Sequence, residues 1–79
     1  MTLLEILIAK LERWPDRYPH AVQGSDGAVY LSVELPRWSD VADIWVTGCE
    51  YIHISNLVFQ AASDYKTSVV NRSEWESSR

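Results

Sequence analysis

Residues 20–35 read His-Ala-Val-Gln-Gly-Ser-Asp-Gly-Ala-Val-Tyr-Leu-Ser-Val-Glu-Leu, and this stretch decides the fold class. Its Asp26-Gly27 pair is a strong hairpin signal, because glycine adopts the positive φ angles that tight turns require. We expect a short strand over 20–23 before the turn and a second strand over 28–35 after it, ended by Pro36. The second strand alternates, with Val29, Leu31, Val33 and Leu35 on one face and Ala28, Tyr30, Ser32 and Glu34 on the other. This pattern is typical of an antiparallel sheet with one face on a core.

An amphipathic helix is predicted at the amino terminus. Thr2-Leu3-Leu4-Glu5 fits a capping box, so the helix should begin at residue 2 or 3. Pro15 should end it and leave Trp14 in the last turn. At 100° per residue the apolar face carries Leu3, Leu4, Leu7, Ile8, Leu11 and Trp14, and the polar face carries Glu5, Ala9, Glu12 and Arg13.

The remaining chain adds short strands and a second helix. Residues 37–42 read as a connector or a helical turn, and 43–47 and 51–55 as a second pair of strands joined around Gly48-Cys49. The residues expected to face inward on this pair are Ile44, Val46, Ile52 and Ile54. Residues 56–62 fit either a strand or a helix, and 67–70 form a last strand before a short helix capped by Asn71. We therefore predict a single α+β domain over 1–79, with an N-terminal helix packed on a small antiparallel sheet of four or five strands and a short C-terminal helix.

Composition narrows the function classes. The 79 residues are 47% hydrophobic and 23% charged, as in an ordinary globular domain. Seven Lys and Arg against eleven Asp and Glu give a net charge of −4, which disfavours binding to nucleic-acid phosphates. The lone Cys49 excludes an intramolecular disulfide, and we see neither a signal peptide nor a membrane-spanning run. These features favour a cytoplasmic protein with no membrane partner.

No catalytic or metal-binding constellation stands out. Cys49 and His53 are four residues apart, but a working dyad also needs a group that orients the base and donors for an oxyanion. One cysteine and two histidines lack the spacing of a zinc site, and the carboxylates of Asp40, Asp43 and Glu50 lack the pattern of a calcium loop. A domain of this size should also offer little depth for a substrate cleft of about 300 Å³ or more. We expect no enzyme, no metal and no cofactor.

The aromatic residues are the most informative feature. Four tryptophans and four tyrosines occur in 79 residues. Trp14 and Trp75 should fill the core, whereas Trp45 is out of phase with Ile44 and Val46 and should face away from the N-terminal helix. We predict an exposed aromatic patch rimmed by Glu34, Asp40, Asp43 and Glu50, with the partner-binding residues Trp38, Asp40, Asp43, Trp45 and Tyr51. The alternative is that the terminal helix or residues 56–62 cover this face.

Three stretches carry a resemblance. They are the helix ending in Trp14-Pro15, the strand over 21–23 that runs into Asp26-Gly27, and residues 64–75, Asp-Tyr-Lys-Thr-Ser-Val-Val-Asn-Arg-Ser-Glu-Trp. The chain resembles small uncharacterised proteins of tailed phages and prophages, which have threonine where Asn71 stands and continue the last helix further. The resemblance implies a phage origin and action in the host cytoplasm, and it implies no catalytic residue.

The sequence thus favours a small non-enzymatic phage accessory protein. We expect it to bind and modulate or inhibit a host protein, as in host takeover or anti-defence. One alternative is a structural module that forms a homodimer through the same face. Another is a nucleic-acid accessory factor that stacks bases on the aromatic side chains, which the acidic charge disfavours.

Overall fold

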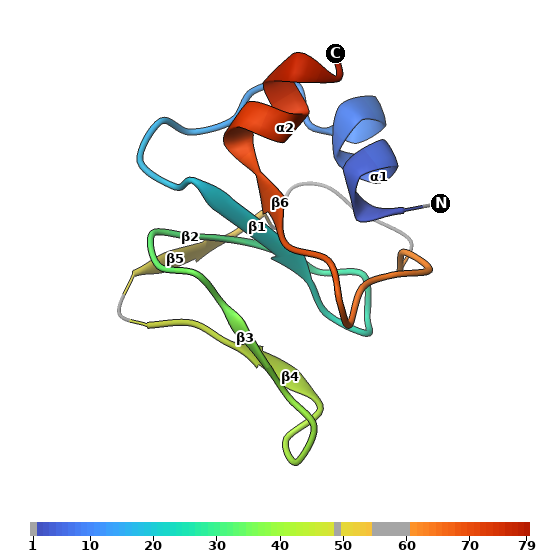
Figure 1. Ribbon diagram of the computed structural model, residues 1–79, viewed down its shortest axis with the longest axis vertical. Helices are drawn as coiled ribbons and strands as arrows, with labels where there is room; N and C mark the ends of the chain where they lie inside the picture. Colours follow the sequence, from blue (N-terminus) through green and yellow to red (C-terminus); the bar gives the residue numbers. More distant parts are fainter. Residues whose placement is uncertain (1, 49, 55–60) are drawn as a thin grey trace.

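The predicted hairpin lies at the centre of a four-stranded antiparallel sheet in the computed structural model, which describes residues 2–48, 50–54 and 61–79 (Figure 1). The strands, in the order β5-β2-β1-β6, are β5 (Tyr51–His53), β2 (Val29–Ser32), β1 (His20–Gln23) and β6 (Val70–Asn71). In the turn between β1 and β2 the Gly24 N–H donates to the Ala28 carbonyl (2.8 Å), and Gly27 has a φ of 88°. The predicted β1–β2 hairpin is therefore present, and the pairing of β5 with β2 and of β6 with β1 places it at the centre of the sheet.

Helix α1 (Leu3–Lys10) begins as predicted and ends earlier. Thr2 and Glu5 form the capping box, in which the Thr2 N–H donates to the Glu5 carboxylate (2.9 Å). The prediction that the helix continues to Trp14 was wrong, because Leu11 is already extended (φ −87°, ψ 110°). This early exit carries the Trp14 ring into the core, where its centroid lies 5.6 Å from that of Trp75 and its Nε1–H donates to the Tyr18 carbonyl.

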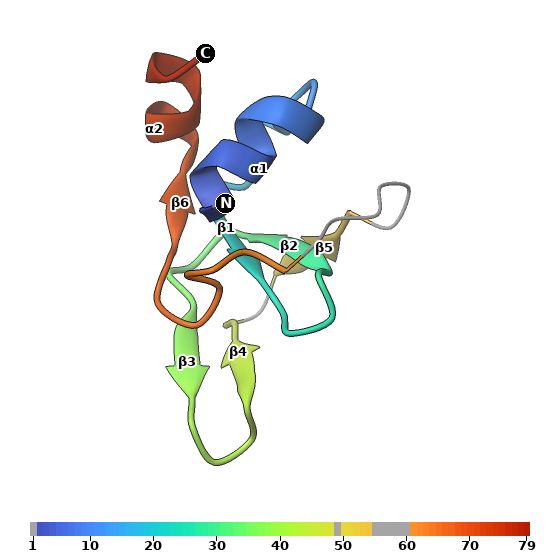
Figure 2. The ribbon, with the colours of Figure 1, turned by 90° about the vertical axis from the view of Figure 1, so that its right-hand side faces the viewer.

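The core lies between one face of the sheet and the two helices (Figure 2). Helix α2 (Arg72–Ser77) begins after Asn71 as predicted, and the Asn71 N–H donates to the Glu74 carboxylate (3.2 Å). Its buried Trp75 donates from Nε1 to the Leu7 carbonyl of α1 (3.1 Å). The buried cluster consists of Leu3, Ile6, Leu7, Leu11, Trp14, Ala21, Val29, Leu31, Ala62, Val70 and Trp75. The predicted α+β class is confirmed.

A separate two-stranded sheet lies on the opposite side from the helices (Figures 1 and 2). It consists of β3 (Arg37–Ser39) and β4 (Ile44–Val46), with Trp38 opposite Trp45. The prediction of a connector or helical turn over 37–42 was therefore wrong, and so was the pairing of 43–47 with 51–55, because β5 pairs with β2 instead. The turn between β3 and β4 contains Asp43 at a positive φ of 56°, which aspartate tolerates.

Several predicted strand ends and orientations were also wrong. Strand β2 ends at Ser32, whose hydroxyl donates to the Glu34 carbonyl (2.7 Å). The Val33 N–H still donates to the Glu50 carbonyl (3.1 Å), but Leu35 lies beyond the sheet and is 64% exposed. Ile44 and Val46 face solvent rather than the core, being 54% and 50% exposed.

The last strand is shorter than predicted, while two residues in and after β5 face the core as expected. Thr67 and Ser68 donate their N–H groups to the Asp64 carbonyl in a turn (3.0 and 2.9 Å), which leaves only Val70–Asn71 as β6. Ile52 and Ile54 pack against the core as predicted. Of the ambiguous segment 56–62, residues 56–60 lie outside the described part of the chain, and Ala62 is buried.

Candidate functional site

The face of the sheet that points away from the helices is aromatic. Strand alternation turns Tyr30, Tyr51 and His53 to this side, because Ala21, Leu31 and Ile52 face the core. The Tyr30 ring stacks on His53 at a centroid distance of 4.9 Å and meets Tyr51 edge-on at 6.1 Å. Tyr51 is 55% exposed, so part of this aromatic face is open to solvent.

Trp45 attaches the β3–β4 hairpin to the rest of the protein. Its Nε1–H is shared between two backbone carbonyls, those of Gln23 (3.0 Å) and Tyr65 (2.9 Å). Its ring contacts Trp38 edge-on at 5.5 Å, and Trp38 contacts Tyr65 in the same way at 6.0 Å. Alternation correctly places Trp45 on the opposite face of the strand from Ile44 and Val46. The predicted exposure of these faces was wrong, because the half-buried Trp45 indole points toward the body of the protein and Ile44 and Val46 are exposed. Trp45 is therefore an anchor for the hairpin.

Lys66 lies beside this tryptophan pair. Its Nζ is 5.9 Å from the ring centroids of both Trp38 and Tyr65. The same ammonium lies 3.9 Å from the Asp43 carboxylate, and both side chains of this pair are more than half exposed. Exposed pairs of this kind contribute little, about 0–1 kcal/mol, so another cation can replace Lys66 at Asp43 at low cost.

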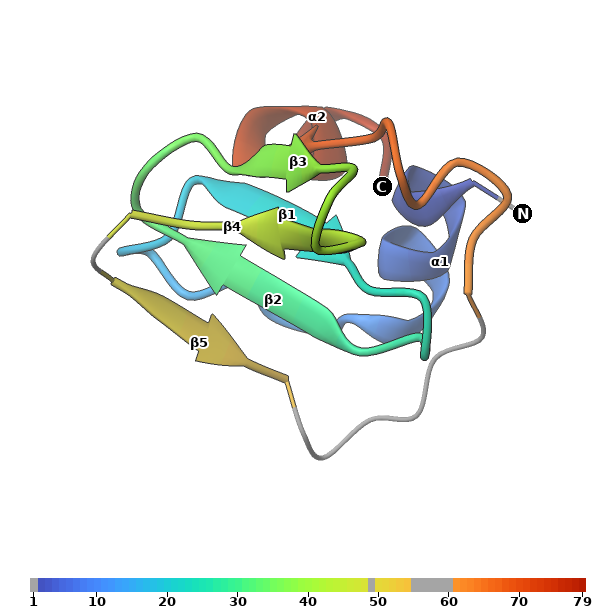
Figure 3. The ribbon, with the colours of Figure 1, turned by 90° about the horizontal axis from the view of Figure 1, so that it is seen from below.

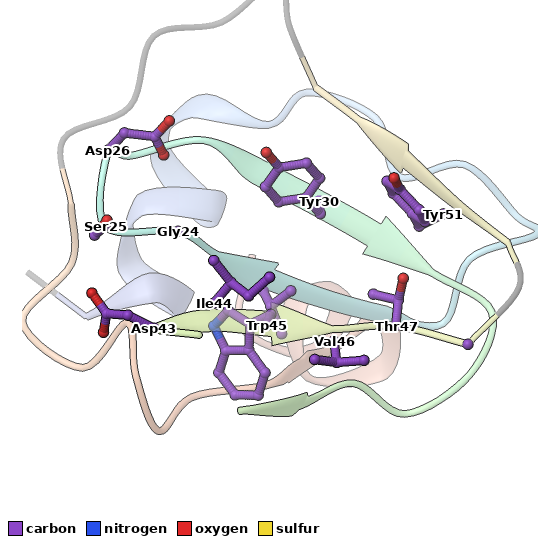
Figure 4. A pocket seen from close by; sticks show the side chains of 12 residues that line it. Gly24, Ser25, Asp26, Tyr30, Asp43, Ile44, Trp45, Val46, Thr47 and Tyr51 are labelled. Atoms are coloured by element: carbon purple, nitrogen blue, oxygen red, sulfur yellow. The ribbon is translucent and has the colours of Figure 1, made fainter. Parts of the chain in front are cut away.

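A groove of about 540 Å³ separates the hairpin from the aromatic face (Figure 4). Val22, Tyr30 and Tyr51 line it from the four-stranded sheet. Residues 44–48 line it from the hairpin, and the β1–β2 turn together with Asp43 lines one end. The volume falls within the range of about 300–1,000 Å³ that ligand pockets occupy. The expectation of little depth in a chain of 79 residues did not anticipate this open groove, which forms because the hairpin lies over the four-stranded sheet.

The groove joins some of the predicted partner-binding residues and leaves others apart. Asp43, Trp45 and Tyr51 line it. Trp38 and Asp40 are outside its lining, and the Trp38 Nε1–H donates to the Asp40 carboxylate (2.9 Å). Of the predicted acidic rim, Glu34 lies against Gly48, while Glu50 forms an ion pair with Arg17.

Sequence reasoning missed several lining residues, namely Val22, Asp26, Ile44 and Val46. Ile44 and Val46 were assigned to the core because aliphatic residues usually are. Asp26 was read only as a turn residue. The signal that could have found it is the position of its turn, which closes the same hairpin that carries Tyr30.

The groove is acidic. Two carboxylates, Asp26 and Asp43, are among its described lining residues, which include no lysine, arginine or histidine. Asp26 accepts a hydrogen bond from the Ala28 N–H (3.0 Å) through one oxygen, which leaves the carboxylate charge at the groove end. An occupant that carries a positive charge is therefore favoured over an anionic one.

The described residues contain no group of three or more metal-ligating side chains. His53 stacks on Tyr30, and Cys49 lies outside the described residues, so the expectation about this pair stays a prediction. Neither described helix has the length and apolar character needed to span a bilayer.

Comparisons with protein-family models, curated proteins and solved structures found no match for this chain.

Proposed function

We propose that this protein is a non-enzymatic binding module whose groove takes a segment of a partner protein. The observation that supports the proposal most is that Ile44, Val46 and Tyr51, each 50–55% exposed, line a groove of about 540 Å³. The helices and the other face of the sheet already form a core, so these apolar side chains are not needed to complete it. Exposed apolar surface beside a groove is typical of interaction sites.

The resemblance to small phage and prophage proteins supports a more specific form of the proposal. The partner would be a protein of the bacterial host, and binding would modulate or inhibit it. A 9.1 kDa domain acts most directly by occupying a surface that its target needs for another interaction.

A protein segment suits the groove better than nucleic acid does. Aromatic rings such as Tyr51 stack bases well, but this mode of binding needs cationic side chains along the phosphate backbone. Here the described lining carries Asp26 and Asp43, and the chain has a net charge of −4. Repulsion between these charges and phosphates disfavours the nucleic-acid alternative.

Site-specific photo-crosslinking tests the proposal. A photoreactive phenylalanine analogue replaces Tyr51 at the groove, and in a matched variant it replaces Val41, which is fully exposed in the β3–β4 turn. Both proteins are irradiated in bacterial cells. We expect a discrete crosslinked species of higher mass from position 51 and none from position 41.

Two outcomes contradict the proposal. Equal crosslinking from both positions would mean that the groove has no special role, and no crosslink from position 51 would mean that it is unoccupied. A product at twice the chain mass would support the homodimer instead.

A further inference from the structure

Among the residues that the structure describes, strand β4 has a free edge beside the groove. One edge of β4 pairs with β3, and no other described strand pairs with it. Figure 3 shows β4 in front of the four-stranded sheet, with β2 and β5 extending beyond it on the side away from β3. Groove-lining residues Tyr30 and Tyr51 come from those two strands. The edge of β4 that no other described strand pairs with therefore borders the same space as the aromatic side chains.

We propose that an extended, lysine- or arginine-containing segment of the partner protein adds to β4 as a third strand. This inference rests on the proposed binding function and specifies how the groove is filled. The added strand lies above β2 and β5. Alternate side chains pack on Tyr30 and Tyr51, and a basic side chain reaches Asp26 and Asp43.

The spacing between strands fits this mode of binding. Paired strands lie about 4.8 Å apart and packed sheets about 10 Å apart, so a strand next to β4 continues the second layer over the sheet below. Trp45 holds β4 at its position above β1 through the Gln23 and Tyr65 carbonyls. A two-stranded sheet is only marginally stable, and a third strand supplies hydrogen bonds to the free edge.

Charge decides which segment fits. Asp26 and Asp43 come from different turns and lie at the same end of the groove (Figure 4). Lys66 lies 3.9 Å from Asp43 in an exposed pair, which leaves the site negative. A basic residue in the added strand gains from both carboxylates, whereas a second copy of this chain brings a further net charge of −4.

Peptide probes test strand addition directly. The parent probe is acetyl-Lys-Thr-Val-Thr-Val-Thr-Lys-amide, in which the lysines and valines share one face of the strand. Binding is followed by NMR on the full chain. We expect the peptide to slow hydrogen exchange of amides within Ile44–Val46 and to shift the signals of Tyr30 and Tyr51. A parent peptide that leaves the β4 amides unaffected overturns the proposal.

Two N-methylated probes show whether the backbone makes the contact. One is methylated at the two valines and the other at the three threonines. Alternate amides of a strand point to opposite edges, so we expect one version to bind about tenfold more weakly or worse and the other to bind like the parent. If both versions bind like the parent, or if both lose binding, strand addition is wrong.

Charge variants test the basic side chain. A probe with glutamate in place of both lysines should bind about tenfold more weakly, and Asp43→Asn should remove most of this preference. Asparagine also tolerates the left-handed backbone at this position, so the turn is retained. The matched control is Asp40→Asn in the same turn but outside the groove lining, which should keep the preference. Equal effects of the two variants contradict the assignment of Asp43. If crosslinking at Tyr51 persists while the peptide tests fail, the binding function stands and only strand addition falls.

Discussion

Trp45→Phe should release the β3–β4 hairpin while leaving the core folded. The substitution keeps an aromatic ring but removes the Nε1–H that donates to the Gln23 carbonyl (3.0 Å) and the Tyr65 carbonyl (2.9 Å). Both acceptors lie in segments distant from Trp45 in sequence, so this single donor connects three parts of the chain. The core cluster of helices and sheet does not include Trp45.

The expected loss is about 1–3 kcal/mol, the cost of leaving partly buried polar groups without a partner. Solvent reaches the site in part, since Trp45 is half-buried, so we expect the lower half of that range. A loss of 1–2 kcal/mol corresponds to about 5- to 30-fold more frequent opening of the hairpin.

Native-state hydrogen exchange measures this local opening. Amides of β3 and β4 should exchange about 5- to 30-fold faster in Trp45→Phe, while those of β1 and β2 change much less. Trp38→Phe is the matched control, because the Trp38 Nε1–H donates only to the exposed Asp40 within the same hairpin. Similar exchange in the two variants, or no change in Trp45→Phe, would refute the anchoring role of Trp45.

Three other substitutions probe stability. Gln23→Met keeps the side-chain length but removes the hydrogen bond to the Gly27 carbonyl (3.1 Å) and the one from the Ala62 N–H (2.7 Å). Urea unfolding should show a loss of about 2–4 kcal/mol in the free energy of unfolding. A loss below about 0.5 kcal/mol would contradict this role of Gln23. Trp75→Phe removes the buried hydrogen bond to the Leu7 carbonyl (3.1 Å) and should lower the free energy of unfolding by about 1–3 kcal/mol. Calorimetry should show this as a lower melting temperature. An unchanged melting temperature would show that this bond does not stabilise the packing of α2 on α1. Hydrogen bonds from Thr2 hold the pKa of Glu5 below its ordinary value, so its stabilising effect is complete at neutral pH and is lost as the pH falls through that lowered pKa. Glu5→Gln should therefore be less stable than the natural chain at pH 7 and equal to it in strong acid, and a difference that does not shrink on acidification would be inconsistent with this linkage.

The predictable parts of the fold depend on local chemistry. The Thr2–Glu5 capping box, the Asp26-Gly27 turn and the Asn71 cap each involve residues within a few positions of one another. Strand β1 occupies the predicted residues because the turn fixes its register with β2. For these elements, both partners of the interaction that fixes the local structure lie within one short stretch of sequence.

The site was less predictable because its geometry depends on distant partners. Alternation separates Trp45 from Ile44 and Val46, but which side faces inward depends on the Gln23 and Tyr65 carbonyls, 22 and 20 positions away. The pairing of β5 with β2 rather than with β4 is likewise a competition between non-local contacts. Strand alternation and charge correctly identify Tyr51 and Asp43 as residues of the site. The groove that contains them could not be predicted, because it depends on how the two sheets lie relative to each other.

The tryptophans serve mainly to hold the fold together. Trp45 and Trp75 donate from the indole N–H to backbone carbonyls of distant segments. Trp14 donates locally, to the Tyr18 carbonyl, and its ring packs against that of Trp75. Their number in this short chain is therefore explained by the need to hold helices, sheet and hairpin together around a small core. The side chains left open at the groove are instead Ile44, Val46 and Tyr51. A partner that binds this surface should contact the aliphatic and phenolic side chains, the edge of β4 that no described strand pairs with, and the carboxylates of Asp26 and Asp43.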